Sequence, residues 1–262
     1  MSTPKSISNR TPYELENLRD MFARNKKIDN FLELYKKETY AIRNENTGKL
    51  WNSKFEIQKK ISEQDRMTQE KIFFIADEIV KIESKVELLD IGIGQAYLEQ
   101  VLKKRHVDLK LSAIDISELS IQRAKKNYNA IGIVDDALEM SRYFKAESFD
   151  AIVAIEVIEH ISPHKIFSFY KQVHSLLKDG GLFIISTPLN EGLSYMKNNP
   201  NAHVREYTES ILKLEFSISK FEILKTKQLI AFHRFYTVKK FISKILNSRW
   251  KPNNIIIVAR KV

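Results

Sequence analysis

The spacing of apolar residues changes near residue 86. Before that point it is helical, as in the segment 29–43, where Phe31, Leu32, Tyr35 and Ile42 share one face. Three more helices are expected in this part of the chain, with a turn-rich stretch over 44–53, and they cover about 11–24, 54–63 and 68–83. The first opens with Thr11-Pro12-Tyr13-Glu14, which has the form of a capping box with proline at the first helical position. The first 83 residues are therefore expected to be all-helical.

After residue 86, near-continuous apolar runs alternate with amphipathic stretches. The runs predict strands at 86–91, 109–115, 131–134, 149–155 and 181–187, and helices are expected between them at about 96–105, 117–129, 137–145 and 163–178. The last helix is expected to begin with Ser162 as N-cap and Pro163 at the next position, and to end before Gly180-Gly181. Apolar strands separated by helices predict a parallel sheet covered on both faces. Two further strands, 221–230 and 253–261, lack such a crossover helix and are expected to pair antiparallel at the sheet edge.

Composition excludes several classes of protein. The 262 residues are 43% hydrophobic, which is enough to form a core and rules out wholesale disorder. No apolar run approaches the roughly eighteen residues of a membrane-spanning helix, and the polar start of the chain lacks the apolar stretch of a signal peptide. With no cysteine, disulfides, thiolate metal sites and cysteine nucleophiles are absent. The expected setting is the cytoplasm.

The net charge of +10 is concentrated at the end of the chain. Residues 217–262 contain eleven Lys and Arg against one acid, Glu222, so the preceding residues are balanced. Such a basic region either attracts phosphate, acidic glycan or anionic lipid, or is simply solvated. Within it, residues 231–250 form a basic amphipathic segment between the last two strands, which either lies on the inner face of a membrane or packs as ordinary core. Nucleic acid is the less favoured partner because the chain shows no accessory RNA-binding module.

A glycine-containing loop follows the first strand of the predicted sheet, in Leu88-Leu89-Asp90-Ile91-Gly92-Ile93-Gly94-Gln95-Ala96. Gly92 permits a tight turn and Gly94 lets a ligand lie against bare backbone, which is typical of a nucleotide-binding loop between a strand and a helix. Asp115 ends the next strand, where a carboxylate can accept hydrogen bonds from both ribose hydroxyls. A dinucleotide is disfavoured, because Tyr97 stands where that fingerprint needs a small residue.

Over residues 68–262 the sequence resembles the class I S-adenosylmethionine-dependent methyltransferases. The resemblance is carried by LLDIGIGQA, AIDISELSIQRAKK, VDDAL, SFDAIVAIEVIEHI and DGGLFIISTP, which stand in the order and spacing of that family. It implies an α/β, Rossmann-like fold with a seven-stranded, mostly parallel sheet whose last strand is antiparallel. Residues 1–67 are then expected to form a helical cap on the substrate side, with Trp51, Arg66 or Lys71 within reach of cofactor or substrate; for Trp51, simple packing is favoured.

The same resemblance implies a role for each residue of the loop and the neighbouring strand ends. Asp90, Gly92 and Gly94 would line the methionine end of the cofactor, and the backbone of Ile155 would lie beside it. Asp115 would hold the ribose, and the following Ile116 would also contact the cofactor. Asp136, or its neighbour Asp135, would meet the adenine together with Ala137.

An acidic and histidine-containing cluster follows the fourth strand. Glu156, Glu159 and His160 lie on one face if the chain turns helically there, and such a set can hold a divalent cation. Ubiquinone-type O-methyltransferases and small-RNA 2′-O-methyltransferases resemble this chain in their Glu-x-x-Glu-His, which ligates a metal together with a later histidine, here matched by His203. This resemblance implies Mg²⁺ or Mn²⁺ bound by Glu156, Glu159, His160 and His203. In the alternative without metal, Glu156 steadies the ammonium of the cofactor and His160 acts as general base.

The predicted reaction is O-methylation with S-adenosylmethionine, in which His160, Glu156 and Glu159 are the candidate catalytic residues. The expected acceptor is a small-molecule hydroxyl of a sugar, a nucleotide-linked sugar or a lipid- or quinone-like intermediate. The segment His203-Val204-Arg205-Glu206-Tyr207-Thr208 resembles one found in bacterial methyltransferases of surface polysaccharides. An RNA 2′-O-methyltransferase and a catalytically silent cofactor-binding partner protein are the alternatives.

Overall fold

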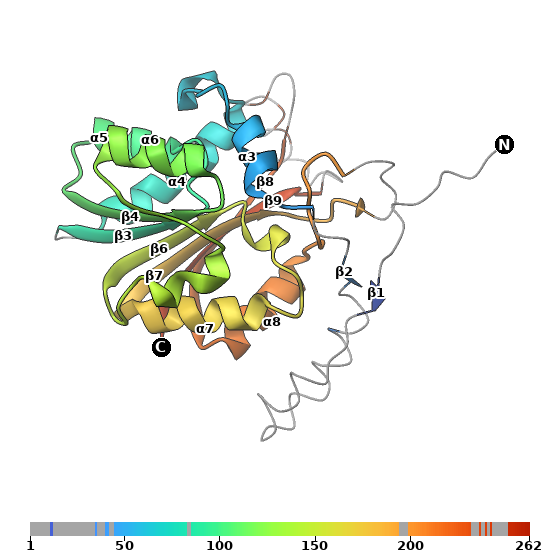
Figure 1. Ribbon diagram of the computed structural model, residues 1–262. Helices are drawn as coiled ribbons and strands as arrows, with labels where there is room; N and C mark the ends of the chain where they lie inside the picture. Colours follow the sequence, from blue (N-terminus) through green and yellow to red (C-terminus); the bar gives the residue numbers. More distant parts are fainter. Residues whose placement is uncertain are drawn as a thin grey trace.

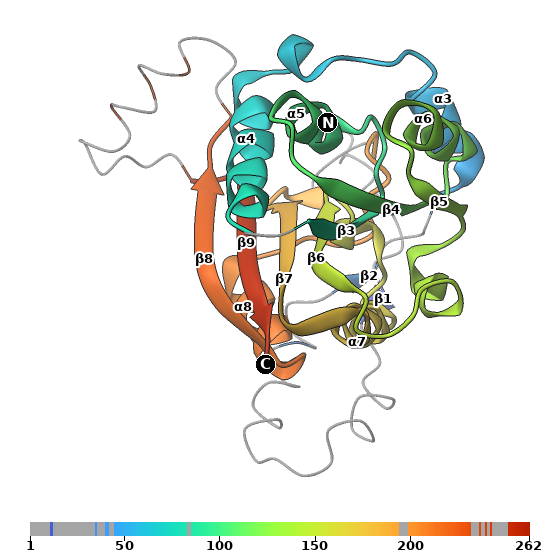
Figure 2. The same ribbon diagram turned by 90° about the vertical axis from the view of Figure 1, so that its left-hand side faces the viewer.

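The protein is built on a seven-stranded sheet (Figures 1 and 2). The computed structural model describes residues 11–12, 35, 40–41, 45–82, 85–193, 199–231, 236, 239, 242 and 251–262. The strands of this sheet are, in spatial order, β5 (Ile131–Val134), β4 (Leu109–Asp115), β3 (Val86–Ile91), β6 (Phe149–Ile155), β7 (Leu177–Pro188), β9 (Asn254–Lys261) and β8 (Phe221–Leu229). The first five are parallel, and β9 lies antiparallel between β7 and β8. The predicted α/β class and the antiparallel last strand are thus confirmed.

Helices cover both faces of the sheet, as the apolar strands predicted (Figure 1). One face carries α4 (Arg66–Val80), α5 (Tyr97–Lys104) and α6 (Glu118–Tyr128), and the other carries α7 (Ile166–Leu176) and α8 (Glu209–Ile218). Each face has its own buried apolar cluster, so the central strands have no solvent-facing side. The result is an open α/β sheet, whose ligand site is expected at the carboxyl ends of the strands.

Several helix boundaries differ from the prediction. The helix expected at 163–178 begins only at Ile166 and ends at Leu176, because Leu177 already pairs with Phe149 and begins β7, which runs through the two glycines. The stretch 137–145 forms a short 3₁₀ helix, η2 (Ala137–Arg142). Helix α8 was not predicted at all, although Thr208 caps it by accepting a hydrogen bond from the Ile211 amide.

The segment before α4 also differs. The stretch expected to be turn-rich contains helix α3 (Gly48–Lys54), whose first turn is capped by Thr47. The helix expected at 54–63 is reduced to η1 (Ile61–Glu63). The reason is that side chains of Gln95 and Gln100 bind the backbone here; the Lys59 amide donates to Gln95 and the Ile61 amide to Gln100. These bonds replace helical ones.

Near the N-terminus, Thr11–Pro12 (β1) and Tyr40–Ala41 (β2) form an antiparallel pair. The prediction of an all-helical first 83 residues, with a helix opening at Thr11, is therefore wrong at these positions, because both segments make strand hydrogen bonds. Most of the helices expected at 11–24 and 29–43 lies outside the described residues. The division into a cap (1–67) and a methyltransferase domain (68–262) stays a prediction.

Most of the amphipathic segment 231–250 also lies outside the described residues, so the predicted membrane contact is not tested there. Among the residues that are described, no helix has the length and apolar character needed to cross a bilayer.

Candidate active site

A cavity of about 780 Å³ opens at the carboxyl ends of β3, β4 and β6. All eight residues predicted to bind the cofactor line it, and they are Asp90, Gly92, Gly94, Asp115, Ile116, Asp136, Ala137 and Ile155. Glu156, His160 and His203 line it as well, whereas Glu159 lies just behind the wall. The structure thus joins the predicted cofactor residues and most of the predicted catalytic cluster in one cavity.

The loop after β3 is bent where the two glycines stand. Gly92 has φ +72° and donates a backbone hydrogen bond to the carbonyl of Ile114 at 2.8 Å. A Cβ at this position would meet Val157 at 2.6 Å, which is too close for any side chain. Gly94 has φ +48°, and its amide donates to the Asp115 carboxylate at 2.9 Å. The loop therefore presents backbone, not side chains, to the cavity.

Acidic side chains mark the ends of the neighbouring strands. Asp115 is buried and holds the amides of Gly94 and Ser117, so its carboxylate is fixed at the cavity wall. Of the two adjacent acids, Asp135 uses both oxygens, on the Asp136 amide and the Tyr143 hydroxyl. Asp136 uses one oxygen, on the Leu138 amide. The structure thus leaves Asp136 better able to accept a further hydrogen bond.

A buried acid beneath the glycine loop was missed by the sequence analysis. Glu99 on α5 is 1% exposed and Asp90 on β3 is 3% exposed. Burial, followed by repulsion from Glu99, raises the pKa of Asp90 well above its usual range, and burial raises the pKa of Glu99 to about 7. The two carboxyl groups can share a hydrogen bond only while one of them holds a proton, and no other side chain among the described residues binds one oxygen of Asp90 or either of Glu99. The pair is thus costly to ionise fully.

We expect Glu99→Gln to stabilise the protein in mildly alkaline solution. A carboxyl group whose pKa is raised in the folded state favours folding at low pH, and that contribution is lost as pH rises from about 4.5 through about 7. Between about pH 5 and about pH 8, the wild-type free energy of unfolding should fall by on the order of 3 kcal/mol relative to that of the variant. Urea unfolding at both pH values measures this difference. The exposed Glu118→Gln serves as control, and equal pH dependence of wild type and Glu99→Gln would refute the expectation.

Three predicted ligands meet at one side of the cavity. Side-chain donor atoms of Glu159, His160 and His203 all lie within 4.8 Å of one another. His203 Nε2 is 4.0 Å from Glu159 Oε1, an oxygen with no hydrogen-bond partner among the described residues. The two imidazole rings lie 4.9 Å apart. Glu159 comes from the 3₁₀ turn η3 (Ile158–His160) after β6, and His203 from the loop that follows β7.

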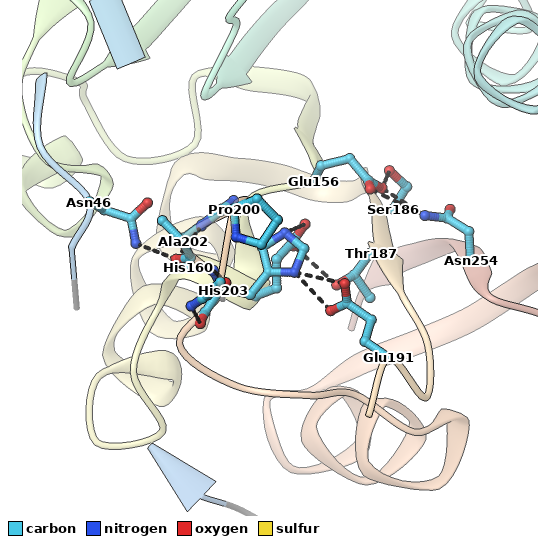
Figure 3. A network of polar contacts seen from close by, with 12 residues as sticks. Asn46, Glu156, His160, Ser186, Thr187, Glu191, Pro200, Ala202, His203 and Asn254 are labelled. Atoms are coloured by element: carbon cyan, nitrogen blue, oxygen red, sulfur yellow. Dashed lines mark hydrogen bonds and ion pairs between the residues drawn. The ribbon is translucent and has the colours of Figure 1, made fainter. Parts of the chain in front are cut away.

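Hydrogen bonds fix the tautomer of both histidines (Figure 3). Nδ1 of His160 lies 3.1 Å from the carbonyl of Ala202, which only accepts, so Nδ1 bears the proton. Nδ1 of His203 lies 2.8 Å from the carboxylate of Glu191 and likewise donates. Neither Nε2 makes a hydrogen bond among the described residues, and that of His203 lies 4.0 Å from Glu159 Oε1. A carboxylate or carbonyl behind a histidine is the arrangement that supports metal-binding imidazoles.

The charge state of this cluster follows from its burial. Burial, followed by the neighbouring His203, lowers the pKa of His160 to about 4, so the ring is neutral at neutral pH. Burial, followed by repulsion from Glu156, raises the pKa of Glu159 well above its usual range. The imidazoles of His160 and His203 and an unpaired carboxylate oxygen of Glu159 fit a divalent cation, which would remove the penalty for ionising Glu159.

Glu156 lies apart from His160 and His203 (Figure 3) and does not belong to the group that they form with Glu159. Its carboxylate is 2.8 Å from the ammonium of Lys71 and accepts hydrogen bonds from Ser186 at 2.7 Å and from Asn254 at 3.1 Å. Burial opposes ionisation, yet the Lys71 charge and these donors keep the pKa of Glu156 below its usual range. Its φ of +56° shows that the backbone turns sharply at the end of β6. A role for Glu156 as a metal ligand stays a prediction that requires Lys71 to move.

Of the three residues expected near the cofactor or substrate, two line the cavity. Lys71 does so from α4, and Trp51 does so from α3. The Trp51 ring stacks on Phe55 and meets the ring of His160 edge-on at 5.1 Å, so it packs and also forms cavity wall. Arg66 lines a separate groove with Phe73, away from the cluster.

Comparisons with known proteins agree with this geometry. Residues 89–185 match the family described as a methyltransferase domain. Over these residues the chain contains a methyltransferase domain.

This chain is also similar to named relatives and to solved structures. It is 30% identical over 149 residues to a carboxy-S-adenosyl-L-methionine synthase of Campylobacter fetus subsp. fetus, covering 55% of this chain and 60% of that protein. It is 27% identical over 163 residues to the mitochondrial ubiquinone biosynthesis O-methyltransferase of Rattus norvegicus, covering 56% and 46%. The chain thus spans less than two thirds of either relative. A SAM-dependent methyltransferase from Archaeoglobus fulgidus has the same fold, with a TM-score of 0.55, 17% identity and coverage of 82% of this chain and 100% of that one.

Proposed function

We propose that this methyltransferase transfers the methyl group of S-adenosylmethionine to a hydroxyl of a small molecule, assisted by a divalent cation at Glu159, His160 and His203. The observation that carries the proposal is the unpaired Glu159 oxygen facing two histidines whose Nε2 atoms are bare. Among the relatives, those named ubiquinone biosynthesis O-methyltransferases support a hydroxyl acceptor. We expect a sugar, a nucleotide-linked sugar or a lipid- or quinone-like intermediate, in keeping with the wider prediction of glycan or quinone chemistry.

The ion pair between Lys71 and Glu156 suits the amino-acid end of the cofactor. Methionine carries an ammonium and a carboxylate on one carbon, and the two side chains offer the opposite charges 2.8 Å apart at the cavity wall. Lys71 is only 4% exposed, so little water reaches its ammonium. A cofactor carboxylate that binds it would therefore replace the Glu156 carboxylate and not water. We infer that Lys71 binds the cofactor carboxylate and Glu156 the ammonium, while Asp115 holds the ribose.

In the transfer step, the acceptor oxygen attacks the methyl carbon, the S–CH₃ bond breaks, and the sulfonium becomes a neutral thioether. The hydroxyl proton must leave. With a cation held through Nε2 of His160 and its neighbours, that proton would pass to water; in the alternative without a cation, Nε2 of His160 would accept it. A bound divalent cation would lower the pKa of the acceptor hydroxyl. Trp51 and Phe55 shield this side of the cavity from water.

The roof of the cavity favours a small acceptor over a nucleic acid. Lys54 of α3 donates to the carbonyl of Pro200 at 2.8 Å, and Asn46 just before α3 donates to that of Ala202 at 2.9 Å. These bonds join α3 and the residue before it to the loop that carries His203. A polymer strand would have to part them. A silent partner protein is disfavoured because Asp90, Asp115, Glu159 and His160 are all present.

We expect metal removal to lower the rate of methyl transfer at least about tenfold, because the cation lowers the barrier to losing the hydroxyl proton. The assay follows formation of S-adenosylhomocysteine with a catechol acceptor after dialysis against chelator, and then after adding Mn²⁺ or Mg²⁺. Calorimetry with S-adenosylhomocysteine on the same sample checks that the cofactor site is intact. An unchanged rate in rigorously metal-free protein would reject the cation and leave His160 as base.

We infer a cytoplasmic setting, with contact to the inner face of a membrane through residues 231–250 as an open prediction. Binding to anionic vesicles, compared with neutral ones, tests that contact.

A further inference from the structure

Most ionisable side chains on the His160 and His203 side of the cavity have an ionic or hydrogen-bonding partner. Lys71 pairs with Glu156, and His203 donates to Glu191. Lys54 is the exception, because no carboxylate lies within ion-pair distance of it among the described residues. Its ammonium makes two contacts there, with the carbonyl of Pro200 at 2.8 Å and with the ring of Trp51 at 4.5 Å from the centroid. An uncompensated cation therefore stands at the rim of the cavity.

We propose that the methyl acceptor carries an anionic group, a carboxylate or a phosphate, that binds Lys54. The proposal rests on the proposed function, since it names the acceptor class for the same site. Lys54 is then a specificity-determining residue and takes no part in the methyl transfer itself.

The positions of Lys54 and His160 set where the charge must lie on the acceptor. Both lie against Trp51, with the ammonium 4.5 Å from its ring centroid and the imidazole centroid 5.1 Å from it. An acceptor that reaches from one to the other passes along this indole. Its reacting hydroxyl then faces His160, and its anionic substituent faces Lys54. A ring-shaped acceptor with these groups on well-separated atoms satisfies the arrangement.

Electrostatics favour this assignment over a neutral acceptor. Burial of part of the side chain lowers the pKa of Lys54, although the residue as a whole is exposed. An anion would supply the missing partner, and the carbonyl of Pro200 supplies none of the opposite charge. A charge-assisted hydrogen bond at such a site changes affinity by about tenfold or more.

The test compares ligands that differ only in charge. Binding of 3,4-dihydroxybenzoate and of its neutral amide, 3,4-dihydroxybenzamide, is measured by quenching of Trp51 fluorescence in a Trp250→Phe background, with S-adenosylhomocysteine present. A second arm compares glucose 6-phosphate with glucose. We expect the anionic member of at least one pair to bind about tenfold more tightly. A preference in the benzoate pair would indicate a carboxylate on the acceptor, and a preference in the glucose pair would indicate a phosphate.

Substitutions then assign the preference to Lys54. Lys54→Gln should reduce the ratio of the two dissociation constants to about one, while Lys49→Gln, an exposed change on the same helix, should leave it unchanged. The preference of the wild type should also weaken as salt is raised.

Two results would overturn the proposal. In the first, the wild-type protein binds neither anionic probe more tightly than the matching neutral probe, or it binds none of the four probes. The other is a preference that survives in Lys54→Gln. Calorimetry with S-adenosylhomocysteine separates the failure of this proposal from the failure of the proposed methyltransferase function. If the protein does not bind S-adenosylhomocysteine, the methyltransferase site itself is in question. If it does, only the anionic charge of the acceptor is rejected.

Discussion

His203→Ala should reduce methyl transfer about a hundredfold or more while leaving the affinity for S-adenosylhomocysteine near that of the wild type. The substitution removes one of three donor atoms that lie within 4.8 Å of one another, and it leaves the glycine loop and Asp115 untouched. The loss should appear in kcat and in the number of Mn²⁺ ions bound per chain. Initial rates, calorimetry with the cofactor product and metal analysis of dialysed protein measure the three quantities.

His164→Ala provides the matched control, because His164 is exposed and does not line the cavity. His160→Ala should fail in the same way as His203→Ala, since both imidazoles belong to the cluster. If His203→Ala retained nearly full activity while His160→Ala lost it, the cation would be superfluous and His160 alone would act as general base.

Much of the sheet could be predicted because its strands are buried on both faces and therefore read as apolar runs. β3, β4, β5 and β6 have the bounds expected from the sequence. Prediction was less accurate where distant groups compete for the backbone. The start of β7 at Leu177 depends on pairing with Phe149, and the short η1 depends on the side chains of Gln95 and Gln100. Neither interaction is visible in a local pattern.

The same distinction holds for the candidate site, where features set by the local sequence could be predicted and contacts between separate elements could not. That Asp90, Gly92 and Asp115 line one cavity could be predicted, because strand ends and tight turns leave a local signature in the sequence. The ion pair of Lys71 with Glu156 and the hydrogen bond from His203 to Glu191 join separate elements, so spacing alone did not show them. These contacts are also the ones that change the chemistry, since they decide which groups are charged.

Glu99 is a different case, because a local signal existed. It stands three residues before the buried Leu102, on the apolar side of α5. An acid on an apolar helix face is rarely buried without a reason, and this position was a fair candidate for a perturbed carboxyl group.

The second large effect is expected in a buried network on the other face of the sheet. Arg205 and Glu215 form an ion pair at 2.6 Å with neither side chain exposed. Tyr170 donates to one oxygen of Glu215, and Tyr35, far away in sequence, donates to the other. Arg205 also lies two residues from His203, so the network anchors the loop that supplies this histidine.

Glu215→Leu should lower the free energy of unfolding by about 3 to 5 kcal/mol, because it leaves the Arg205 guanidinium buried without its counter-charge. Tyr170→Phe, which removes one hydrogen bond to the same carboxylate, should lower it by only about 1 kcal/mol. Urea unfolding of each variant measures the difference.

The double variant Arg205→Met with Glu215→Leu separates an unpaired charge from lost packing. If desolvation of the guanidinium dominates, the double variant should be more stable than Glu215→Leu alone, since apolar side chains replace a charge that has no partner. If instead the network stabilises chiefly through packing around Tyr35 and Tyr170, the double variant should be less stable than either single one. A loss below about 1 kcal/mol in Glu215→Leu would show that water reaches Arg205, and the ion pair could then not anchor the His203 loop.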